Sequence, residues 1–315
     1  MSIATLLAGA ALAQDSTHAQ TTNEQCSLAV VSRQMGPQQR VCDTTVVQEM
    51  AKKGHVYEQN QLGIASILAI GSDLSEKEAL QWFQQSAERG YAPAQVNLAV
   101  MYINGWGTAT NYGTALRWLR AAADQKFGRA NYNLGILYLQ GQGVHQDYAE
   151  AFRWFQKGAD AGDSNAQSNL GYMYDQGLGC ERSLKTAAAW YRKAAEAGNP
   201  LGENNLADLY LRGEGLKQDS GKAFRWFQKA AAQGHTGARI KLAYMYAEGM
   251  GTQKNPELAY AWLTSAALSG DNRGRDMVSK LESELTPRQI SEAREQAHNL
   301  PAPASKQLSA KAFAQ

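Results

Sequence analysis

Residues 166–195 read AQSNLGYMYDQGLGCERSLKTAAAWYRKAA, and this stretch decides the fold. Its first half places apolar residues at four-residue steps, which predicts one face of a helix: Ala166, Leu170 and Tyr174. A Gly177-x-Gly179 turn ends that helix, because glycine adopts left-handed backbone angles at little cost. Ser183 then caps a second helix by accepting hydrogen bonds from its first turn. The stretch therefore predicts a helix, a glycine turn and a second helix.

The same pattern returns at a fixed interval along the chain. Six tryptophans of the second helix stand 36 residues apart, at Trp82, Trp118, Trp154, Trp190, Trp226 and Trp262. The residue that caps the second helix keeps this interval, at Ser75, Asn111, Asp147, Ser183, Asp219 and Asn255. A fixed period between 20 and 50 residues is the signature of a solenoid. We expect each tryptophan to pack between the first helix of its own repeat and the next repeat. Glutamates three residues later predict capping boxes at Ser75 and Asp147.

The ends of the array are degenerate, as the caps of a solenoid are. We predict an all-α fold, an α/α right-handed superhelical solenoid of 36-residue helix-turn-helix repeats. It is expected to cover about residues 43–299 as one domain, although the length of the chain alone would suggest two. Its parts are a vestigial capping helix at 43–54, six repeats at 55–270 with the first degenerate, and C-terminal capping helices at 271–299. Pro301 and Pro303 end the last helix, and residues 300–315 are predicted to form a disordered tail.

The repeat resembles a known family, the Sel-one-like repeat, a relative of the tetratricopeptide repeat. Its first half is carried here by Ala166, Gln167, Leu170, Gly171, Tyr174, Gly177 and Gly179, and its second half by Asp147, Ala151, Trp154 and Ala159. The resemblance implies a right-handed superhelix whose first helices line a concave groove. It also implies adaptor or scaffold activity. Some cysteine-rich secreted bacterial members are described as penicillin-binding or β-lactamase proteins, but this chain lacks their cysteine pair in each repeat.

The first segment predicts export. Leu6 to Ala13 is a short apolar run that ends in a small-x-small pattern before Gln14, although no Lys or Arg precedes Arg33. We therefore expect a signal peptide at 1–13, a polar leader at 14–42, and a periplasmic or secreted protein. Cys26 and Cys42 precede the repeats, and a disulfide between them would tether the leader to the first helix. The alternative is two unpaired thiols.

Composition and motifs argue against most chemistry. Net charge is +2, from 31 Lys and Arg against 29 Asp and Glu, and no basic stripe with aromatic residues indicates nucleic-acid binding. No apolar run is long enough for a membrane span. The five histidines share no ligand spacing, and the motifs of phosphate loops and serine nucleophiles are absent. The sequence therefore predicts no cofactor, no metal and no catalytic residue. Cys180 is read either as a reactive thiol or as a small buried hydrophobe.

One column has binding character. Asparagine recurs one residue before the core leucine of the first helix, at Asn97, Asn133, Asn169 and Asn205, with Gln61 and Lys241 at its ends. A helix turns ~100° per residue, so these side chains are expected beside the buried face. Their amides can bond the backbone of an extended ligand in the groove. The alternative is that they only bond neighbouring helices. Further groove candidates are Arg129, Tyr132, Tyr172, Glu203, Asp208 and Arg239.

Two functions follow from these observations. The first is a non-enzymatic scaffold or adaptor that binds a protein or peptide in its groove. The second is a cell-envelope hydrolase of the β-lactamase or penicillin-binding type, which turnover of a chromogenic β-lactam distinguishes from the first. The sequence names neither the partner nor the oligomeric state.

Overall fold

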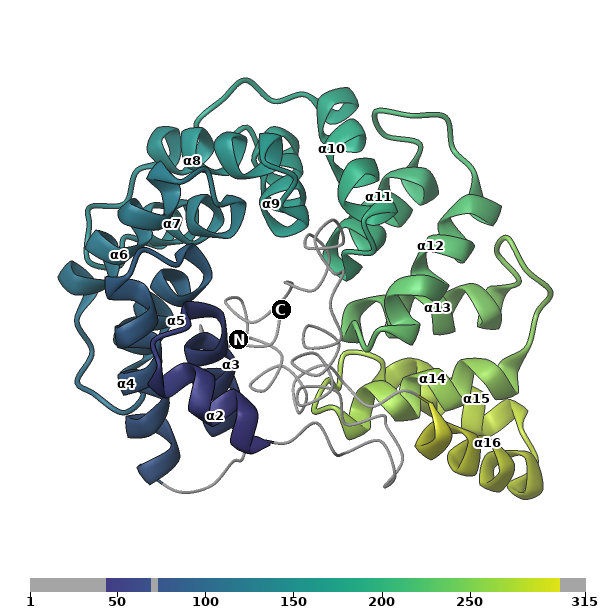
Figure 1. Cartoon of the computed structure of the whole chain (residues 1–315). Helices are drawn as coiled ribbons and strands as arrows, with labels where there is room; N and C mark the ends of the chain where they lie inside the picture. Colours follow the sequence, from purple (N-terminus) through teal and green to yellow (C-terminus); the bar gives the residue numbers. More distant parts are fainter. Residues whose placement is uncertain (1–43, 69–72, 301–315) are drawn as a thin grey trace. The chain divides into compact units, whose positions relative to one another are not determined.

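The computed structural model describes residues 44–68 and 73–300, and every regular element within them is a helix. The helices are α2 (Thr44–Lys52), α3 (Val56–Leu68), α4 (Asp73–Glu88), α5 (Ala92–Asn104), α6 (Tyr112–Asp124), α7 (Gly128–Gln140), α8 (Tyr148–Asp160), α9 (Ser164–Gln176), α10 (Leu184–Glu196), α11 (Pro200–Arg212), α12 (Ser220–Ala232), α13 (Thr236–Glu248), α14 (Pro256–Leu268), α15 (Arg275–Glu284) and α16 (Pro287–Asn299) (Figure 1).

The helices pack in consecutive pairs. In each repeat the first helix, here called the A helix, packs against the second, the B helix. Within each of the two units defined below, the B helix also packs against the next A helix. The A helices are α3, α5, α7, α9, α11 and α13, and the B helices are α4, α6, α8, α10, α12 and α14. The predicted all-α array of helix-turn-helix repeats is confirmed. By their contacts the helices form two units, which divide between Asp163 and Ser164: unit 1 holds α2–α8 and unit 2 holds α9–α16.

Side-chain caps define where the B helices begin. Five of the six predicted capping residues accept a backbone N–H of the first turn, at Asn111, Asp147, Ser183, Asp219 and Asn255. The sixth prediction is wrong, because α4 already begins at Asp73, two residues before Ser75. The capping box at Asp147 is also wrong, since the Glu150 side chain pairs with Arg153 instead. A complete capping box is formed by Thr286 and Gln289 at the start of α16.

The second glycine of the Gly-x-Gly turn allows a close approach between repeats. A Cβ added at Gly215 would lie 2.4 Å from the Leu184 carbonyl oxygen, and one at Gly251 would lie 2.2 Å from the Ser220 carbonyl oxygen. Both glycines also have positive φ, 71° and 70°. These two turns therefore rest directly on the first turn of the preceding B helix, where no side chain fits.

The expectation that the tryptophans fill the core between the helices is wrong. The side chain that fills the space between A and B helices is the residue after each tryptophan, at 0–3% exposure: Phe83, Leu119, Phe155, Tyr191, Phe227 and Leu263. The tryptophans are half-buried, except Trp262 at 8%. Successive residues on a helix point ~100° apart, so only one of the two neighbours faces the A helix directly. The tryptophan column thus covers the edge of the core and does not form its centre.

Two helices close unit 2 at its C-terminal side. Both α15 and α16 pack against α14, and Leu281, Ala293 and Ala297 join the core of this unit. Among the described residues, no helix combines the length and apolar character that a membrane crossing needs. The predicted signal peptide, the leader, Cys26, Cys42 and residues 301–315 of the predicted tail lie outside the described residues.

Candidate functional site

The fourth residue of each A helix belongs to a buried polar column, made of Gln59, Gln95, Asn131, Gln167, Glu203 and Arg239. These side chains link helices. Gln95 Nε2 donates to the Ala87 carbonyl oxygen at 3.2 Å, and Gln125 Nε2 donates to Gln95 Oε1 at 2.9 Å. Gln95 therefore joins its A helix to the B helices on both sides. Its role is to satisfy buried polar groups within the array.

Two members of this column carry charge. Glu203 is 3% exposed and accepts a hydrogen bond from Gln233 Nε2 at 2.8 Å. Burial raises the pKa of Glu203 to about 7, against the opposing effects of Gln233 and Lys229. Arg239 is fully buried and donates to the Ala231 carbonyl oxygen and to Ser265 Oγ, at 3.4 and 3.0 Å. The expectation that Glu203 and Arg239 line a groove is therefore wrong, because both point into the helix packing.

In unit 1 the predicted asparagines are buried. Asn97 is 2% exposed and donates to Asn60 Oδ1 at 2.9 Å, so it bonds the equivalent helix of the preceding repeat. Asn133 is 1% exposed, and neither polar atom of its amide has a hydrogen-bond partner among the described residues. Neither amide offers an open surface to a ligand, in contrast to the expectation. Tyr132, also a groove candidate, is 4% exposed and packs at 6.1 Å from the Phe155 ring.

Another unit 1 candidate, Arg129, is half-buried beside Asp163. Burial lowers the pKa of the Arg129 guanidinium, and the charge of Asp163 opposes this shift. This pair lies at the start of α7 and at the residue before α9. It brings opposite charges together without a group that would act on a substrate.

In unit 2 the predicted asparagines are half-buried and bonded locally. Asn169 Nδ2 donates to the carbonyl oxygen of Asn165, one turn earlier in α9, at 2.9 Å. Asn205 Oδ1 accepts from Asn204 Nδ2 at 3.0 Å and also bonds the Tyr191 side chain. Part of each amide remains accessible. Binding of a ligand by this column stays a prediction.

An exposed face lies next to these asparagines. Tyr172 on α9 is 42% exposed, and Tyr244, two repeats later on α13, is 50% exposed. Between them in the same column stands Asp208 of α11, which pairs with Lys241 of α13. We call these residues, with Asn169 and Asn205, the A face of unit 2. It combines open aromatic rings with a hydrogen-bonding strip, and it lies on three successive A helices.

A cleft of about 220 Å³ continues this face toward the C-terminus. Its walls come from α13, α14, α15 and the loop between α14 and α15. The lining residues are Ile240, Tyr244, Leu263, Arg273, Gly274, Asp276 and Met277. A Cβ added at Gly274 would lie 2.4 Å from Leu263 Cδ2, so the backbone at Gly274 lies directly against the tip of that side chain. The lining is mainly apolar with a charged rim. Such a lining suits an apolar side chain of a partner.

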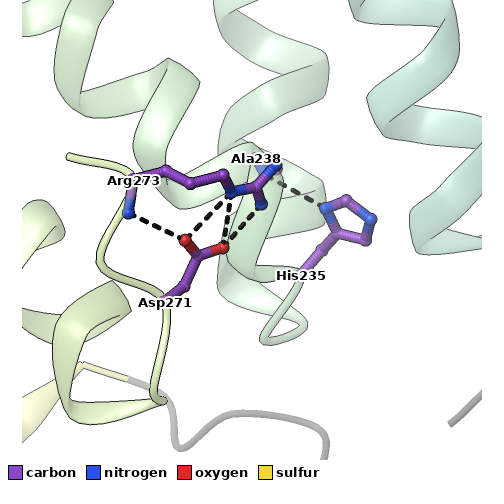
Figure 2. A network of polar contacts seen from close by, with 4 residues as sticks. All are labelled: His235, Ala238, Asp271 and Arg273. Carbon is purple, nitrogen blue, oxygen red and sulfur yellow. Dashed lines mark hydrogen bonds and ion pairs between the residues drawn. The ribbon is translucent and has the colours of Figure 1, made fainter. Parts of the chain in front are cut away.

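The loop beside the cleft holds a polar network (Figure 2). Arg273 binds Asp271 through two nitrogens, with Nε at 2.9 Å from Oδ1 and Nη2 at 2.5 Å from Oδ2. His235 caps α13, since its Nδ1 accepts the Ala238 N–H at 3.0 Å. Burial lowers the pKa of His235 to about 4, and the charges of Lys241, Arg273 and Arg239 act in the same direction. His235 is therefore neutral at neutral pH and serves as the cap of α13, while the Arg273–Asp271 pair holds the loop.

Cys180 and metal binding are the remaining chemical candidates. Cys180 is a half-buried free thiol whose Sγ lies 3.6 Å from the Met173 carbonyl oxygen, and burial raises its pKa. A raised pKa reduces the thiolate fraction and hence the reactivity. Across residues 44–68 and 73–300, no three His, Cys, Asp or Glu side chains gather in a way that would hold a metal.

Sequence reasoning found Tyr172 and Asp208 but missed Tyr244, Arg273 and Met277. Tyr244 stands two periods after Tyr172, so extending that column by 72 residues would have found it. Arg273 and Met277 carry no such signal, because the repeat pattern ends before α15. Only the packing of the C-terminal helices brings them to Tyr244.

Paired helices that recur every 36 residues, with an open face of aromatic and polar side chains, define an α-helical repeat protein. More specifically, the chain belongs to the Sel1 repeat family. That family matches six consecutive segments, at residues 59–91, 92–127, 128–163, 164–199, 200–235 and 237–271.

A solved structure agrees with this assignment. A Sel1 repeat protein from Oxalobacter formigenes is 31% identical, with a TM-score of 0.61, and the match covers 71% of this chain and 95% of that chain. The match to c5321, a protective antigen of uropathogenic Escherichia coli strains with an SLR fold, has 26% identity and a TM-score of 0.49. It covers 85% of this chain and 64% of that one. The comparison with curated proteins found no match.

Proposed function

We propose that the protein is a non-enzymatic scaffold that binds an extended protein segment on the A face of unit 2. The observation that carries the proposal is Tyr244, whose ring is half exposed at the rim of the apolar cleft. Membership of a family of interaction repeats supports the same reading. A partner would place one apolar side chain in the cleft and lay its backbone along α13, α11 and α9.

The chemistry of the face suits a backbone ligand. Asn169 and Asn205 each retain accessible surface, and an amide offers both a donor and an acceptor to a peptide bond. The aromatic rings supply contact area at low cost in side-chain entropy, as Tyr172 and Tyr244 have few rotatable bonds. Apolar burial provides affinity, and the amides fix the register.

The experiment is affinity capture from an envelope extract with three forms of the full chain: wild type, Tyr244→Ala and Tyr148→Ala. Tyr148 is the matched control, since it is a tyrosine with 40% exposure on the B helix α8. We expect one partner to be captured by wild type and Tyr148→Ala but lost with Tyr244→Ala. Equal capture by all three forms would place the binding surface elsewhere. Titration of the purified partner against Asn169→Ala and Asn205→Ala then tests the amides, each expected to weaken binding ~5-fold.

Hydrolysis of β-lactams, the second function considered, is tested on the same preparation. We expect no turnover of a chromogenic β-lactam by purified wild-type protein. Turnover above that of a heat-denatured sample would replace the scaffold proposal with the hydrolase.

We also propose that the scaffold acts in the periplasm or after secretion. The apolar run from Leu6 to Ala13 supports this location, and a Cys26–Cys42 bridge would form in such an oxidising compartment. N-terminal sequencing of protein from the cell envelope should give Gln14 as the first residue. Mass spectrometry should find Cys180 as the one free thiol, whereas three free thiols would refute the bridge.

A further inference from the structure

The B helices α10 and α12 carry an unusual surplus of positive charge. Their cations are all exposed, and they are Lys185, Arg192, Lys193, Lys222, Arg225 and Lys229. The only acidic residue within either helix is Glu196, at the end of α10. We call these six residues the basic patch.

A comparison within the chain shows that packing does not require this charge. Helices α8 and α12 share the run AFRWFQK, at residues 151–157 and 223–229, so they place the same residues against the core. The residues around this run differ. Glu150 and Asp160 of α8 correspond to Lys222 and Ala232 of α12. Two acids are thus replaced by a base and a neutral residue on one B helix, with the core sequence unchanged.

Two lysines of the patch lie over tryptophan rings of their own helices. Lys193 Nζ lies 3.9 Å from the centre of the Trp190 ring, and Lys229 Nζ lies 4.2 Å from that of Trp226. Cation–π contact restrains each lysine while its ammonium group stays open on the other side. Ordering before binding lowers the entropy that a partner must overcome.

Tyr210, at the end of α11, joins the two rows of cations. Arg192 of α10 donates to its hydroxyl at 3.4 Å, and Lys222 of α12 lies 5.3 Å from the centre of its ring. The two helices therefore present their charges on one surface, across a single repeat interface.

Few acids neutralise the patch. Lys222 pairs with the capping residue Asp219 at 3.3 Å. Among the ion pairs of the described residues, none involves Arg192, Lys193 or Lys229. Glu203 feels the charge of Lys229, but its carboxyl is buried and bonded to Gln233. The patch is thus left with charge that an outside acid can pair.

We infer that the basic patch is a second docking surface, and that it binds an acidic segment of a protein rich in Asp and Glu. Carboxylates are the groups that best match rows of exposed ammonium and guanidinium groups. A membrane surface fits less well, because within the described residues neither α10 nor α12 carries an exposed large apolar side chain to insert. Single-stranded nucleic acid also fits less well, since the tryptophan faces on which bases would stack are occupied by lysines.

The test uses the full chain and a fluorescein-labelled oligoglutamate of about 12 residues, long enough in extended form to cross two repeats. Fluorescence anisotropy measures its affinity for wild type, for the double variant Lys193→Glu/Lys229→Glu, and for Lys157→Glu. Lys157 is the matched control, because it lies 4.2 Å over the Trp154 ring of α8 in the same sequence run. A Lys193→Arg/Lys229→Arg variant keeps the charge, and circular dichroism confirms folding of every form.

We expect wild type to bind the peptide, with an affinity that falls as salt rises. The double charge reversal should weaken binding at least ~10-fold, while Lys157→Glu and the arginine variant stay within ~2-fold of wild type. Tyr244→Ala should bind normally, since the A face is a separate surface. The inference is overturned if wild type does not bind the peptide, or if Lys157→Glu loses as much as the double variant. Tighter binding to phosphatidylglycerol vesicles or to oligothymidylate than to the peptide would overturn the assignment to a protein partner.

Discussion

Gly135 of α7 lies directly against the ring of Phe155 of α8: a Cβ added at Gly135 would stand 2.6 Å from Phe155 Cδ1 and Cε1. The same fit occurs where Gly63 meets Phe83 and where Gly171 meets Tyr191. The missing side chain on the A helix makes room for the large ring on the B helix. The two columns are therefore coupled through shape, and each determines how close the two helices come.

Gly135→Ala should destabilise the protein by ~1–3 kcal/mol, because the new methyl group overpacks the core. Phe155→Leu should restore part of that lost stability in the double variant. The preceding repeat already combines an alanine and a leucine at the equivalent positions, Ala99 and Leu119. Another repeat combines Ala207 with Phe227 at these positions, so the helices can shift slightly to make room for a methyl group. The destabilisation by Gly135→Ala should therefore lie near the lower end of the range given above. Urea denaturation of the two single variants and the double variant measures the coupling, and additive effects would contradict it.

Phe227→Ala and Trp226→Ala should differ in cost although the residues are neighbours. Phe227 is fully buried, so its truncation should cost ~3–5 kcal/mol. Trp226 is half-buried and packs against the edge of the core with Lys229 over its ring, so its truncation should cost clearly less. Denaturation midpoints decide the order. If Trp226→Ala lost more stability than Phe227→Ala, the tryptophan and not the phenylalanine would form the centre of the core.

Glu203→Gln should stabilise the protein at alkaline pH. The folded-state pKa of Glu203, about 7, lies above that of an unfolded glutamate, ~4.3. The contribution of Glu203 to stability is therefore fully present below pH ~4.3 and is lost as the pH rises through 7, on the order of 3–4 kcal/mol in total. The amide removes this loss and matches Gln59, Gln95 and Gln167 in the same column.

The measurement is urea stability at pH 5 and pH 8 for wild type, Glu203→Gln and the exposed control Glu196→Gln. Only Glu203→Gln is expected to reduce the difference between the two pH values. A wild type equally stable at both would show that Glu203 ionises without cost.

Asn97→Ala and Asn133→Ala should have opposite consequences. Asn97→Ala leaves the buried Asn60 amide without its partner and should cost ~1–3 kcal/mol. Asn133→Ala removes a buried amide that has no hydrogen-bond partner among the described residues, so stability should stay the same or rise. Thermal denaturation compares the two. A large loss for Asn133→Ala would show that its amide is bonded within the folded chain.

Much of the fold was predictable because the same sequence pattern recurs in each repeat. The capping residues Asn111, Ser183 and Asp219 act within one turn of helix, and such local hydrogen bonds depend on the sequence nearby. The choice between Trp226 and Phe227 as the core residue was not predictable, since both recur with the period and both are large. Their orientation depends on how the A helix is placed against the B helix.

The candidate site was predictable only in part. The column of asparagines was visible in the sequence, but the burial of Asn97 and Asn133 depends on neighbouring helices that periodicity does not describe. The charge difference between α8 and α12 was present in the sequence. The sequence did not show that these charges share one surface, because that depends on the contacts of Arg192 and Lys222 with Tyr210.

The sequence by itself determined the helical repeat, its 36-residue period, the helix caps and the glycine turns. All of these rest on interactions between residues close in the chain, which a repeated pattern displays many times. The tertiary structure decided which aromatic column fills the core, which polar side chains are buried, and where the cleft beside Tyr244 opens. Those properties depend on contacts between helices ~30 or more residues apart, and at α15 the repeat pattern no longer applies. Burial and exposure are set by packing, so residues of the same type at the same repeat position, such as Asn133 and Asn169, end in different surroundings.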